Sequence, residues 1–311
     1  MNGKKYDVVA VGLQCIDIVC SPVTPGLLER EMTPLKSARL MLGGDALNQA
    51  VVLAALGARV GLAGLVGNDR LGDVLLEQLG QHAIDVLDSR GDVNTAISLV
   101  LVKADGERHF VCQPESNDAL ALSHIDTRAV CDAAFLSVGG CMDLPSLDGG
   151  DMLALLDLAR RAGTRTALDF RLGERLPEPS ALRELLSRAD YVLPNEHEAR
   201  ILTGEGDDPE VMVRRLRELG ATNCVIKLGD QGCYVAAEGF EGRVPPCPCR
   251  CVDTTGAGDS FVGAFLYALT RGWDIRRCAR FANAAGSITV EHTGANGAIH
   301  SAAQVEARMD S

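Results

Sequence analysis

The 311-residue chain has few aromatic residues and a deficit of positive charge. Phe, Trp and Tyr together make up 4% of the residues, whereas hydrophobic residues make up 47%, so the core must be built mainly from small aliphatic side chains. Such a core suits helices packed closely on a parallel sheet. The net charge of −12 argues against generic binding to nucleic acids or to anionic membranes, because both require basic surface.

The chain also lacks a long hydrophobic run. The apolar stretch at residues 8–18 is too short to span a bilayer and contains Asp17, and no charged-then-apolar leader opens the sequence. We therefore expect a cytoplasmic protein without a membrane partner. Its 11 cysteines should then be reduced and mostly buried. Cys247, Cys249 and Cys251 alternate, so their thiols point one way and do not by themselves surround a tetrahedral zinc.

Strand and helix patterns alternate along most of the chain. This alternation predicts an α/β fold with a mostly parallel central sheet and helices on both faces. The expected strands cover residues 8–12, 60–66, 134–138, 166–170, 191–193, 224–227 and 233–236. The expected helices cover residues 43–56, 73–79, 152–162, 181–187, 196–203, 209–219, 257–270 and 276–289. Gly57 provides the stop signal for the first helix.

One segment departs from this alternation. Two β-rich runs at 95–102 and 108–112 flank the turn at 104–107, which predicts an antiparallel hairpin. The mixed segment 22–41 can supply further strands. We therefore expect a single domain over residues 1–311, with a small β-sheet lid formed from about 14–41 and 93–118.

The most informative motif is the run at 252–261. Gly256, Ala257 and Gly258 precede a long apolar helical pattern, so their N–H groups and the helix dipole point at one spot. Asp259 stands beside that spot and can accept the proton of an attacking hydroxyl. The motif favours phosphoryl transfer onto a hydroxyl. A helix cap and an ordinary tight turn are the plainer interpretations.

Two further motifs follow predicted strands. Lys227, Gly229 and Gly232 form a glycine-rich turn that lets a nucleotide approach the backbone, although such turns are common. Asn195 and Glu198 are three residues apart at a helix start, so they lie on one face. They can organise magnesium through its waters, or they can form a capping box; both interpretations can hold.

The fourth motif lies near the N-terminus. Gly43 and Gly44 admit a ligand to the backbone, and Asn48 offers a donor and an acceptor to a polyol. Asp17 offers a carboxylate that accepts two hydroxyl hydrogen bonds. Taken singly, each of these residues is more often a cap or a turn residue.

Together the four motifs resemble the ribokinase-like, or PfkB, family of carbohydrate kinases over nearly the whole chain. The resemblance implies an ATP-dependent kinase that phosphorylates a hydroxymethyl group of a small sugar, with Mg²⁺ and a β-sheet lid that often forms a homodimer. It makes Asp259 the catalytic base and residues 256–258 the anion hole. The implied sugar contacts are Asp17, Gly43, Gly44 and Asn48. The implied nucleotide and magnesium contacts are Asn195, Glu198, Lys227, Gly229, Gly232 and Asn283.

The resemblance also implies a monovalent cation, K⁺ in many relatives. Asp253 and Thr255 fall at that position, and backbone oxygens near Thr289, His292 and Gly294 complete it. Ala298 stands where ribokinases offer a hydroxyl, which weakens the expectation of potassium activation.

Other departures concern the acceptor. Gly140 stands where ribokinases usually carry a glutamate, so strict ribose specificity is in doubt. Phe110 is the one aromatic of the expected hairpin, a mild argument against a nucleoside base. Arg90, Arg108 and Arg171 could meet an anionic sugar, although solvated surface arginines are commoner. A nucleoside kinase and a non-catalytic sugar- or nucleotide-binding relative remain the alternatives, whereas a dinucleotide-dependent dehydrogenase lacks its Gly-x-Gly-x-x-Gly turn.

Overall fold

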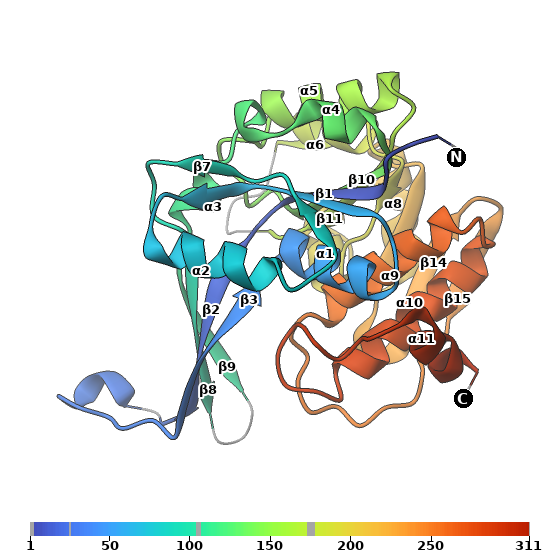
Figure 1. Ribbon diagram of the computed structural model, residues 1–311. Helices are drawn as coiled ribbons and strands as arrows, with labels where there is room; N and C mark the ends of the chain where they lie inside the picture. The colour runs from blue at the N-terminus through green and yellow to red at the C-terminus, as the bar shows by residue number, and fades with distance from the viewer. Residues whose placement is uncertain (1–2, 25, 104–106, 173–177, 311) are drawn as a thin grey trace.

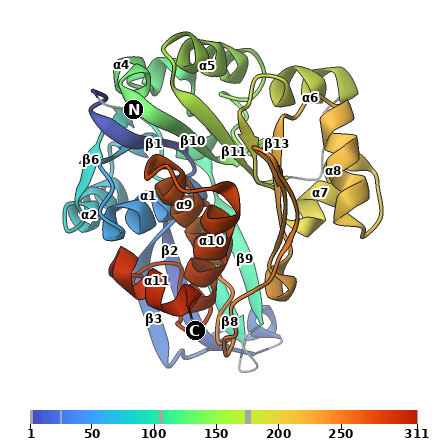
Figure 2. The ribbon, with the colours of Figure 1, turned by 90° about the vertical axis from the view of Figure 1, so that its right-hand side faces the viewer.

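The computed structural model describes residues 3–24, 26–103, 107–172 and 178–310. Within these ranges the chain forms a large mixed sheet, a small sheet and a two-stranded sheet, with helices on both faces of the large one (Figures 1 and 2). The large sheet has the strand order β15-β14-β13-β12-β11-β10-β1-β4-β6, and all its pairings are parallel except β13–β14 and β14–β15. The predicted α/β fold with a mostly parallel central sheet is confirmed.

The strands of the large sheet are β1 (Tyr6–Gly12), β4 (Val60–Ala63), β6 (Ile84–Val86), β10 (Ala133–Cys141), β11 (Arg165–Phe170), β12 (Tyr191–Val192), β13 (Asn223–Lys227), β14 (Cys233–Ala237) and β15 (Phe240–Val244). The small sheet contains β2 (Cys15–Val23), β3 (Ser37–Gly43), β8 (Ile97–Lys103) and β9 (Arg108–Gln113). The strands β5 (Leu65–Gly67) and β7 (Ser89–Gly91) form the two-stranded sheet.

The α-helices are α1 (Asp45–Ala55), α2 (Arg70–Leu79), α3 (Glu115–Asp118), α4 (Thr127–Cys131), α5 (Gly150–Arg161), α6 (Pro179–Leu186), α7 (Glu196–Thr203), α8 (Pro209–Glu218), α9 (Ala257–Thr270), α10 (Ile275–Thr289) and α11 (Ala302–Met309). Short 3-10 turns cover Leu27–Glu29, Leu122–His124 and Gly229–Gln231. Within the described ranges, no helix combines the length and the apolar character needed to cross a bilayer.

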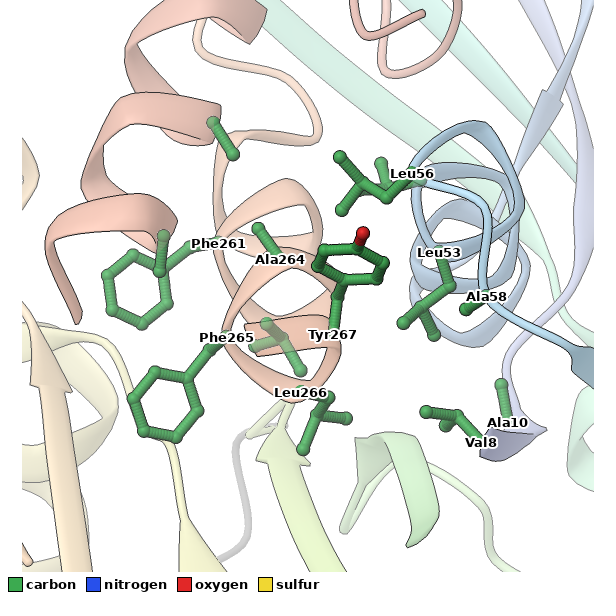
Figure 3. Packing of buried hydrophobic residues seen from close by; sticks show 14 of the residues in the cluster. Val8, Ala10, Leu53, Leu56, Ala58, Phe261, Ala264, Phe265, Leu266 and Tyr267 are labelled. Atoms are coloured by element: carbon green, nitrogen blue, oxygen red, sulfur yellow. The ribbon is translucent and has the colours of Figure 1, made fainter. Parts of the chain in front are cut away.

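Two hydrophobic cores lie on opposite faces of the large sheet, because successive side chains of a strand point to opposite faces. Val8 and Ala10 of β1 face the core formed with α1, α9 and α10, whereas Val9 and Val11 face the core formed with α5, α6 and α8. Figure 3 shows the first of these cores, where the apolar side chains of α9 meet those of α1 and β1. This packing fixes the start of α9 beside the carboxyl end of the sheet, where ligands of open α/β folds bind.

The aromatic side chains, although few, are concentrated in that core. Phe265 is fully buried on α9; its ring lies edge-on to Tyr191 at 5.8 Å and stacks with Phe261 at 6.1 Å. Most other core residues are Ala, Val and Leu, as the composition predicts.

The small sheet projects from the main body below the level of α2 (Figure 1). Its order is β3-β2-β8-β9, with β2 and β8 parallel and the outer pairings antiparallel. The predicted hairpin is therefore present as β8 and β9. Residues 104–106 of its expected turn lie outside the described residues.

The prediction of a single strand over residues 60–66 is wrong. The strand is interrupted at Gly64, which separates β4 of the large sheet from β5 of the two-stranded sheet. A Cβ atom on Gly64 would lie 2.2 Å from Nε2 of Gln14, so the backbone passes close to another side chain at the break. A short apolar run does not reveal such a break, because both halves are buried.

The sequence patterns also missed β15. This strand pairs with β14 across the two-residue turn at Glu238 and Gly239, both of which have positive φ (45° and 86°). Two such residues form the type of turn that matches the twist of a hairpin. Glutamate is not a residue that usually signals this turn, so no local pattern predicted it.

Candidate active site

Two cavities meet at the start of α9. The larger has a volume of about 750 Å³ and lies between the main body and the small sheet; the smaller has a volume of about 440 Å³. Thr254 lines both cavities, Gly256 and Asp259 line the larger, and Ala257 and Gly258 line the smaller. The turn at 254–258 is therefore the boundary across which a group can pass from one cavity to the other.

The N-terminus of α9 has no side-chain cap. Gly256 occupies the cap position with φ 72°, and a Cβ atom there would lie 2.6 Å from Cα of Ala295, so only glycine fits this turn. By contrast, Asp69, Asn195 and Asp274 cap α2, α7 and α10 with their side chains. Because the first N–H groups of a helix have no acceptor within it, this uncapped end can bind an anion.

Asp259 lies in the first turn of α9 and contacts Asn48 of α1. The side-chain amide of Asn48 donates a hydrogen bond of 2.7 Å to Oδ2 of Asp259. Burial raises the pKa of Asp259 well above its ordinary value, and the nearby carboxylates of Asp45 and Asp169 raise it further. The hydrogen bond from Asn48 and the charge of Lys227 act in the opposite direction. Burial and the neighbouring carboxylates outweigh these two effects, so Asp259 holds a proton more tightly than an ordinary aspartate does.

Asn48, which the sequence suggests as a polyol contact, also forms hydrogen bonds with two other side chains. Asn48 lines the larger cavity, but its amide is held between Asp259 and Asn296. The amide nitrogen of Asn296 donates to Oδ1 of Asn48 at 2.9 Å and to the carbonyl of Leu42 at 2.9 Å. No sequence signal pointed to Asn296, which lies in the loop between α10 and α11.

Asp17, Gly43 and Gly44 meet at the edge of the larger cavity, which Asp17 and Gly44 line. A Cβ atom on Gly43 would lie 2.5 Å from Cγ of Asp17, so the glycine makes room for this carboxylate. Cys15 Sγ donates to Oδ1 of Asp17 at 3.4 Å. Burial raises the pKa of Asp17.

The larger cavity also contains a charged cluster that the sequence analysis did not identify. Arg171 Nε lies 3.1 Å from Oδ2 of Asp143, and Nη1 lies 4.0 Å from Oδ1 of Asp45. Burial raises the pKa of Asp45 to about 6, although Arg171 counteracts this. The sequence offers Arg171 as a contact for an anionic sugar; in the structure two carboxylates flank it.

Lys227 contributes a buried ammonium group beside the anion-binding turn. A Cβ atom on Gly258 would lie 3.6 Å from Nζ of Lys227, which places the ammonium at the boundary of the two cavities. Its counter-ion is Asp169, whose Oδ1 lies 2.5 Å from Nζ. Gln49 donates to Oδ2 of Asp169 at 2.8 Å and accepts from the hydroxyl of Ser137 at 2.7 Å.

Asn195 and Glu198 form the capping box of α7. The backbone N–H of Glu198 donates to Oδ1 of Asn195 at 2.9 Å, and the N–H of Asn195 donates to Oε2 of Glu198 at 2.7 Å. The capping interpretation is therefore confirmed. Burial raises the pKa of Glu198, and the charge of Lys227 lowers it.

The smaller cavity contains the remaining nucleotide candidates: Lys227, Gly229, Gly232 and Asn283 all line it. The amide of Asn283 donates to the carbonyls of Val244 and Pro245 at 3.1 and 2.9 Å, so it holds the chain that leaves β15. Cys247, Cys249 and Cys251 line the same cavity. Within the described residues, no three His, Cys, Asp or Glu side chains gather so that they could hold a metal ion.

The residues expected at a monovalent cation surround Asp253, which is buried. The N–H groups of Thr255 and Gly294 donate to its two carboxylate oxygens, each at 2.7 Å, and Arg108 forms an ion pair with it. The hydroxyl of Thr289, which is not among the expected ligand atoms, lies within hydrogen-bond distance of the hydroxyl of Ser260 and the carbonyl of Ala285. The N–H of His292 donates to the carbonyl of Thr289 at 3.0 Å.

The structure also shows where the residues considered for acceptor specificity lie, namely Gly140, Arg90, Arg108 and Phe110. Gly140 has φ 83°, and a Cβ atom there would lie 2.3 Å from Cδ1 of Leu13, so no side chain fits. Arg90 pairs with Asp73 and Asn68 and does not line the larger cavity. Phe110 and Arg108 do line it.

A family model and curated relatives match this chain over most of its length. The family model described as pfkB family carbohydrate kinase matches residues 5–302. The chain is 30% identical to fructokinase-1 of Oryza sativa subsp. japonica over 329 residues, covering 100% of both chains. It is 32% identical to probable fructokinase-7 of Arabidopsis thaliana over 309 residues, covering 93% of this chain and 88% of the other.

Solved structures give the same result. The ribokinase of Thermotoga maritima is 26% identical and superposes with a TM-score of 0.83, covering 98% of this chain and 100% of the other. Arabidopsis thaliana ribokinase complexed with ribose and ATP is also 26% identical with a TM-score of 0.83, covering 98% of this chain and 99% of the other.

Proposed function

The chain belongs to the PfkB family of carbohydrate kinases, and from that premise we propose that it transfers the γ-phosphoryl group of ATP to a hydroxymethyl group of a small neutral sugar. The observation that carries the proposal is the meeting of two cavities at the uncapped start of α9, with Asp259 on the side of the larger one. The sugar binds in the larger cavity and ATP in the smaller.

Asp259 is the general base. Its carboxylate accepts the proton of the acceptor hydroxyl as that oxygen attacks the γ-phosphorus, and the bond from this phosphorus to the β,γ-bridging oxygen breaks. The negative charge on the transferring group is held by the N–H groups of Gly256, Ala257 and Gly258 and by the helix dipole. The position of Lys227 beside Gly258 supports a direct contact of its ammonium with the same group.

Neutrality of the sugar follows from the charges of the larger cavity. Six acidic residues and two arginines line it: Asp17, Asp45, Glu107, Asp118, Asp143 and Asp259, with Arg108 and Arg171. Arg171 is itself flanked by two of these carboxylates. An anionic sugar would meet net negative charge here and would be repelled. Asp17 accepts hydroxyl hydrogen bonds beside Gly43 and Gly44. Two observations make fructose the first candidate. The chain is similar to fructokinases over its full length, and Gly140 offers no side chain where ribokinases usually carry a glutamate.

The nucleotide lies against Gly229, Gly232 and Asn283. Asn195 and Glu198 would hold a hydrated Mg²⁺, which would neutralise phosphate charge, because an amide and a carboxylate suit an ion that keeps most of its waters. The capping hydrogen bonds engage one oxygen of each side chain, and a carboxylate or amide oxygen has a second lone pair for a water.

The small sheet acts as a lid over the sugar, since its residues Ser98, Arg108 and Phe110 line the larger cavity. We also propose that residues 1–311 form a single domain, with its lid formed from about 14–41 and 93–118. We further propose a homodimer made through the outer face of this sheet. Leu40 and Val111 support that contact as exposed apolar residues of β3 and β9.

The 11 free cysteines support a reducing compartment, the cytoplasm.

A substrate panel tests the function. ADP release is measured with fructose, ribose, ketodeoxygluconate, phosphosugars and nucleosides as acceptors. We expect turnover with a neutral sugar, with fructose ahead of ribose, and none with phosphosugars. Turnover of nucleosides alone would establish a nucleoside kinase instead, and tight ligand binding without any turnover would establish a non-catalytic binding protein.

Substitution of the base provides the second test. Asp259→Asn should lower kcat by about 10²–10⁴-fold, the usual cost of losing a general base. Asp207→Asn is the matched control, because this side chain is 80% exposed. Near-normal turnover by Asp259→Asn would overturn the assignment of the base.

A further inference from the structure

Arg108 joins the small sheet to the anion-binding turn. It is the first residue of β9, and its guanidinium group forms an ion pair with Asp253 and donates a hydrogen bond to the hydroxyl of Thr255. Only 14% of the Arg108 side chain and 3% of the Asp253 side chain are exposed. An ion pair this well shielded from water is screened little by salt.

The carboxylate of Asp253 needs this counter-charge. It lies three residues before Gly256, and its two oxygens already accept the N–H groups of Thr255 and Gly294. A buried carboxylate without a cation beside it is costly, and its field would oppose the binding of a phosphoryl anion at the neighbouring turn. The positive charge of the Arg108 guanidinium offsets the field of this carboxylate.

The donor set does not fit the monovalent cation that the family resemblance implies. Both oxygens of Asp253 accept N–H groups, and Oδ1 has the guanidinium of Arg108 as a second partner. The hydroxyl of Thr255 accepts from Arg108, and the carbonyl of Thr289 already accepts the N–H of His292. Ala298 contributes no side-chain oxygen. A guanidinium group in contact with Asp253 would also repel a second cation at the same carboxylate.

We propose that Arg108 supplies, from the small sheet, the positive charge that a bound monovalent cation would otherwise provide at Asp253. This inference rests on the proposed kinase function. Because Arg108 also lines the larger cavity, a sugar held under the small sheet keeps the guanidinium at Asp253. Arg108 is thus a positioning residue, which ties the electrostatics of the anion hole to closure over the acceptor.

The first experiment compares rates in KCl and in tetramethylammonium chloride. Wild type should turn over at the same rate, within about twofold, in both salts. Arg108→Gln should lower kcat at least about tenfold, less than the 10²–10³-fold cost of removing a direct oxyanion donor, and should change the sugar KM less. Arg108→Lys should restore part of the rate. Arg70→Gln, whose side chain is 98% exposed in the wild type, is the control.

Chemical rescue separates a charge effect from a merely structural one. Millimolar guanidinium or K⁺ should raise the rate of Arg108→Gln and leave that of Arg70→Gln unchanged. More than about twofold activation of wild type by K⁺, or an unchanged kcat in Arg108→Gln, would overturn the proposal.

Hydrogen exchange gives a readout that needs no turnover. Arg108→Gln should speed amide exchange at Thr255 and Gly294, whose N–H groups are held by Asp253, whereas Arg70→Gln should not. If no acceptor in the panel is phosphorylated but this difference is present, the kinase proposal fails while the pairing stands. Equal exchange in wild type and Arg108→Gln would refute the pairing.

Discussion

The side-chain amide of Asn48 lies 2.7 Å from the carboxylate of Asp259, and this contact joins two motifs that are 211 residues apart in the sequence. Asn48 is in turn held by Asn296 at 2.9 Å. The orientation of the proposed base therefore depends on three segments: α1, α9 and the loop that follows α10.

Asn48→Ala should lower kcat and move the acid limb of the pH profile upward. The hydrogen bond from Asn48 stabilises the ionised form of Asp259, so its loss raises the pKa of this base. A hydrogen bond to a charged group contributes about 1.5–3 kcal/mol, so its loss should move the limb measurably. In wild type the limb should already lie well above pH 4, because burial raises this pKa.

A pH profile of kcat/KM measures this effect. The control is the double variant: with Asp259→Asn already in place, Asn48→Ala should cost little more, because the group that it positions is gone. Full additivity of the two losses would contradict the coupling.

Gly43→Ala should weaken sugar binding more than it slows turnover. The new Cβ atom would lie 2.5 Å from Cγ of Asp17 and must displace this carboxylate from the larger cavity. Loss of a hydrogen-bonded charge should raise the sugar KM by about 10–100-fold. Gly150→Ala is the matched control, since nothing lies within 4 Å of its Cβ position. Steady-state kinetics measure the sugar KM and kcat of each variant. An unchanged KM in Gly43→Ala would argue against a sugar contact by Asp17.

ATP should protect Cys249 and Cys251 from alkylation. Both are exposed and line the smaller cavity, whereas Cys112 is exposed and lines the larger one. At ten times Kd, a non-hydrolysable ATP analogue should slow iodoacetamide modification of the first two about tenfold. The sugar should slow that of Cys112 instead. Peptide mass spectrometry follows each site, with the buried Cys278 as the unreactive reference. Equal rates with and without the analogue would place the nucleotide elsewhere.

Asp88→Asn should stabilise the protein at neutral pH. Among the described residues, Oδ2 of Asp88 is buried without a hydrogen-bond partner, as is Oε1 of Gln14, while Gln14 Nε2 donates to Oδ1 of Asp88 at 2.7 Å. Burial raises the pKa of Asp88 to about 6. An asparagine amide in its place can donate to Gln14 and carries no charge.

The pH dependence identifies the cause. The native pKa of Asp88 exceeds the unfolded value near 3.9, so ionisation costs stability as the pH rises from about 4 to about 6 and costs nothing below that window. We expect Asp88→Asn to gain about 1–3 kcal/mol at pH 7.5 and little at pH 4. Urea unfolding at the two pH values measures the difference, and an equal gain at both would point to packing instead.

Local signals predicted the elements that surround the site. The helix at Glu196–Thr203 was expected at its observed bounds, because an N-cap and a glycine stop act within a few residues of each end. The start of α9 at Ala257 was expected because a glycine-rich turn precedes a long apolar helical pattern there. By contrast, β15 and the break at Gly64 depend on a hairpin turn and on a close approach of Gln14, which local patterns do not contain.

The candidate site was predicted in part. Asp17, the two glycines of the N-terminal motif and Asp259 meet at one cavity, as a pattern of spaced motifs suggested. Asp45, Asn296 and the pairing of Lys227 with Asp169 were not foreseen. Their side chains become important through partners from other strands and helices, and sequence spacing does not reveal these partners.

The sequence by itself determined the family, the α/β fold and the turn at 256–258 with its carboxylate, because glycine conformation, helix caps and hydrophobic period are set by neighbouring residues. Only the tertiary structure decided what surrounds that turn. It brought Asn48 to Asp259, Lys227 to Gly258, and Arg108 to Asp253 across the cavity from the small sheet. These contacts arise from the packing of distant elements around two cores, and the charges that they bring together set the chemistry of the site.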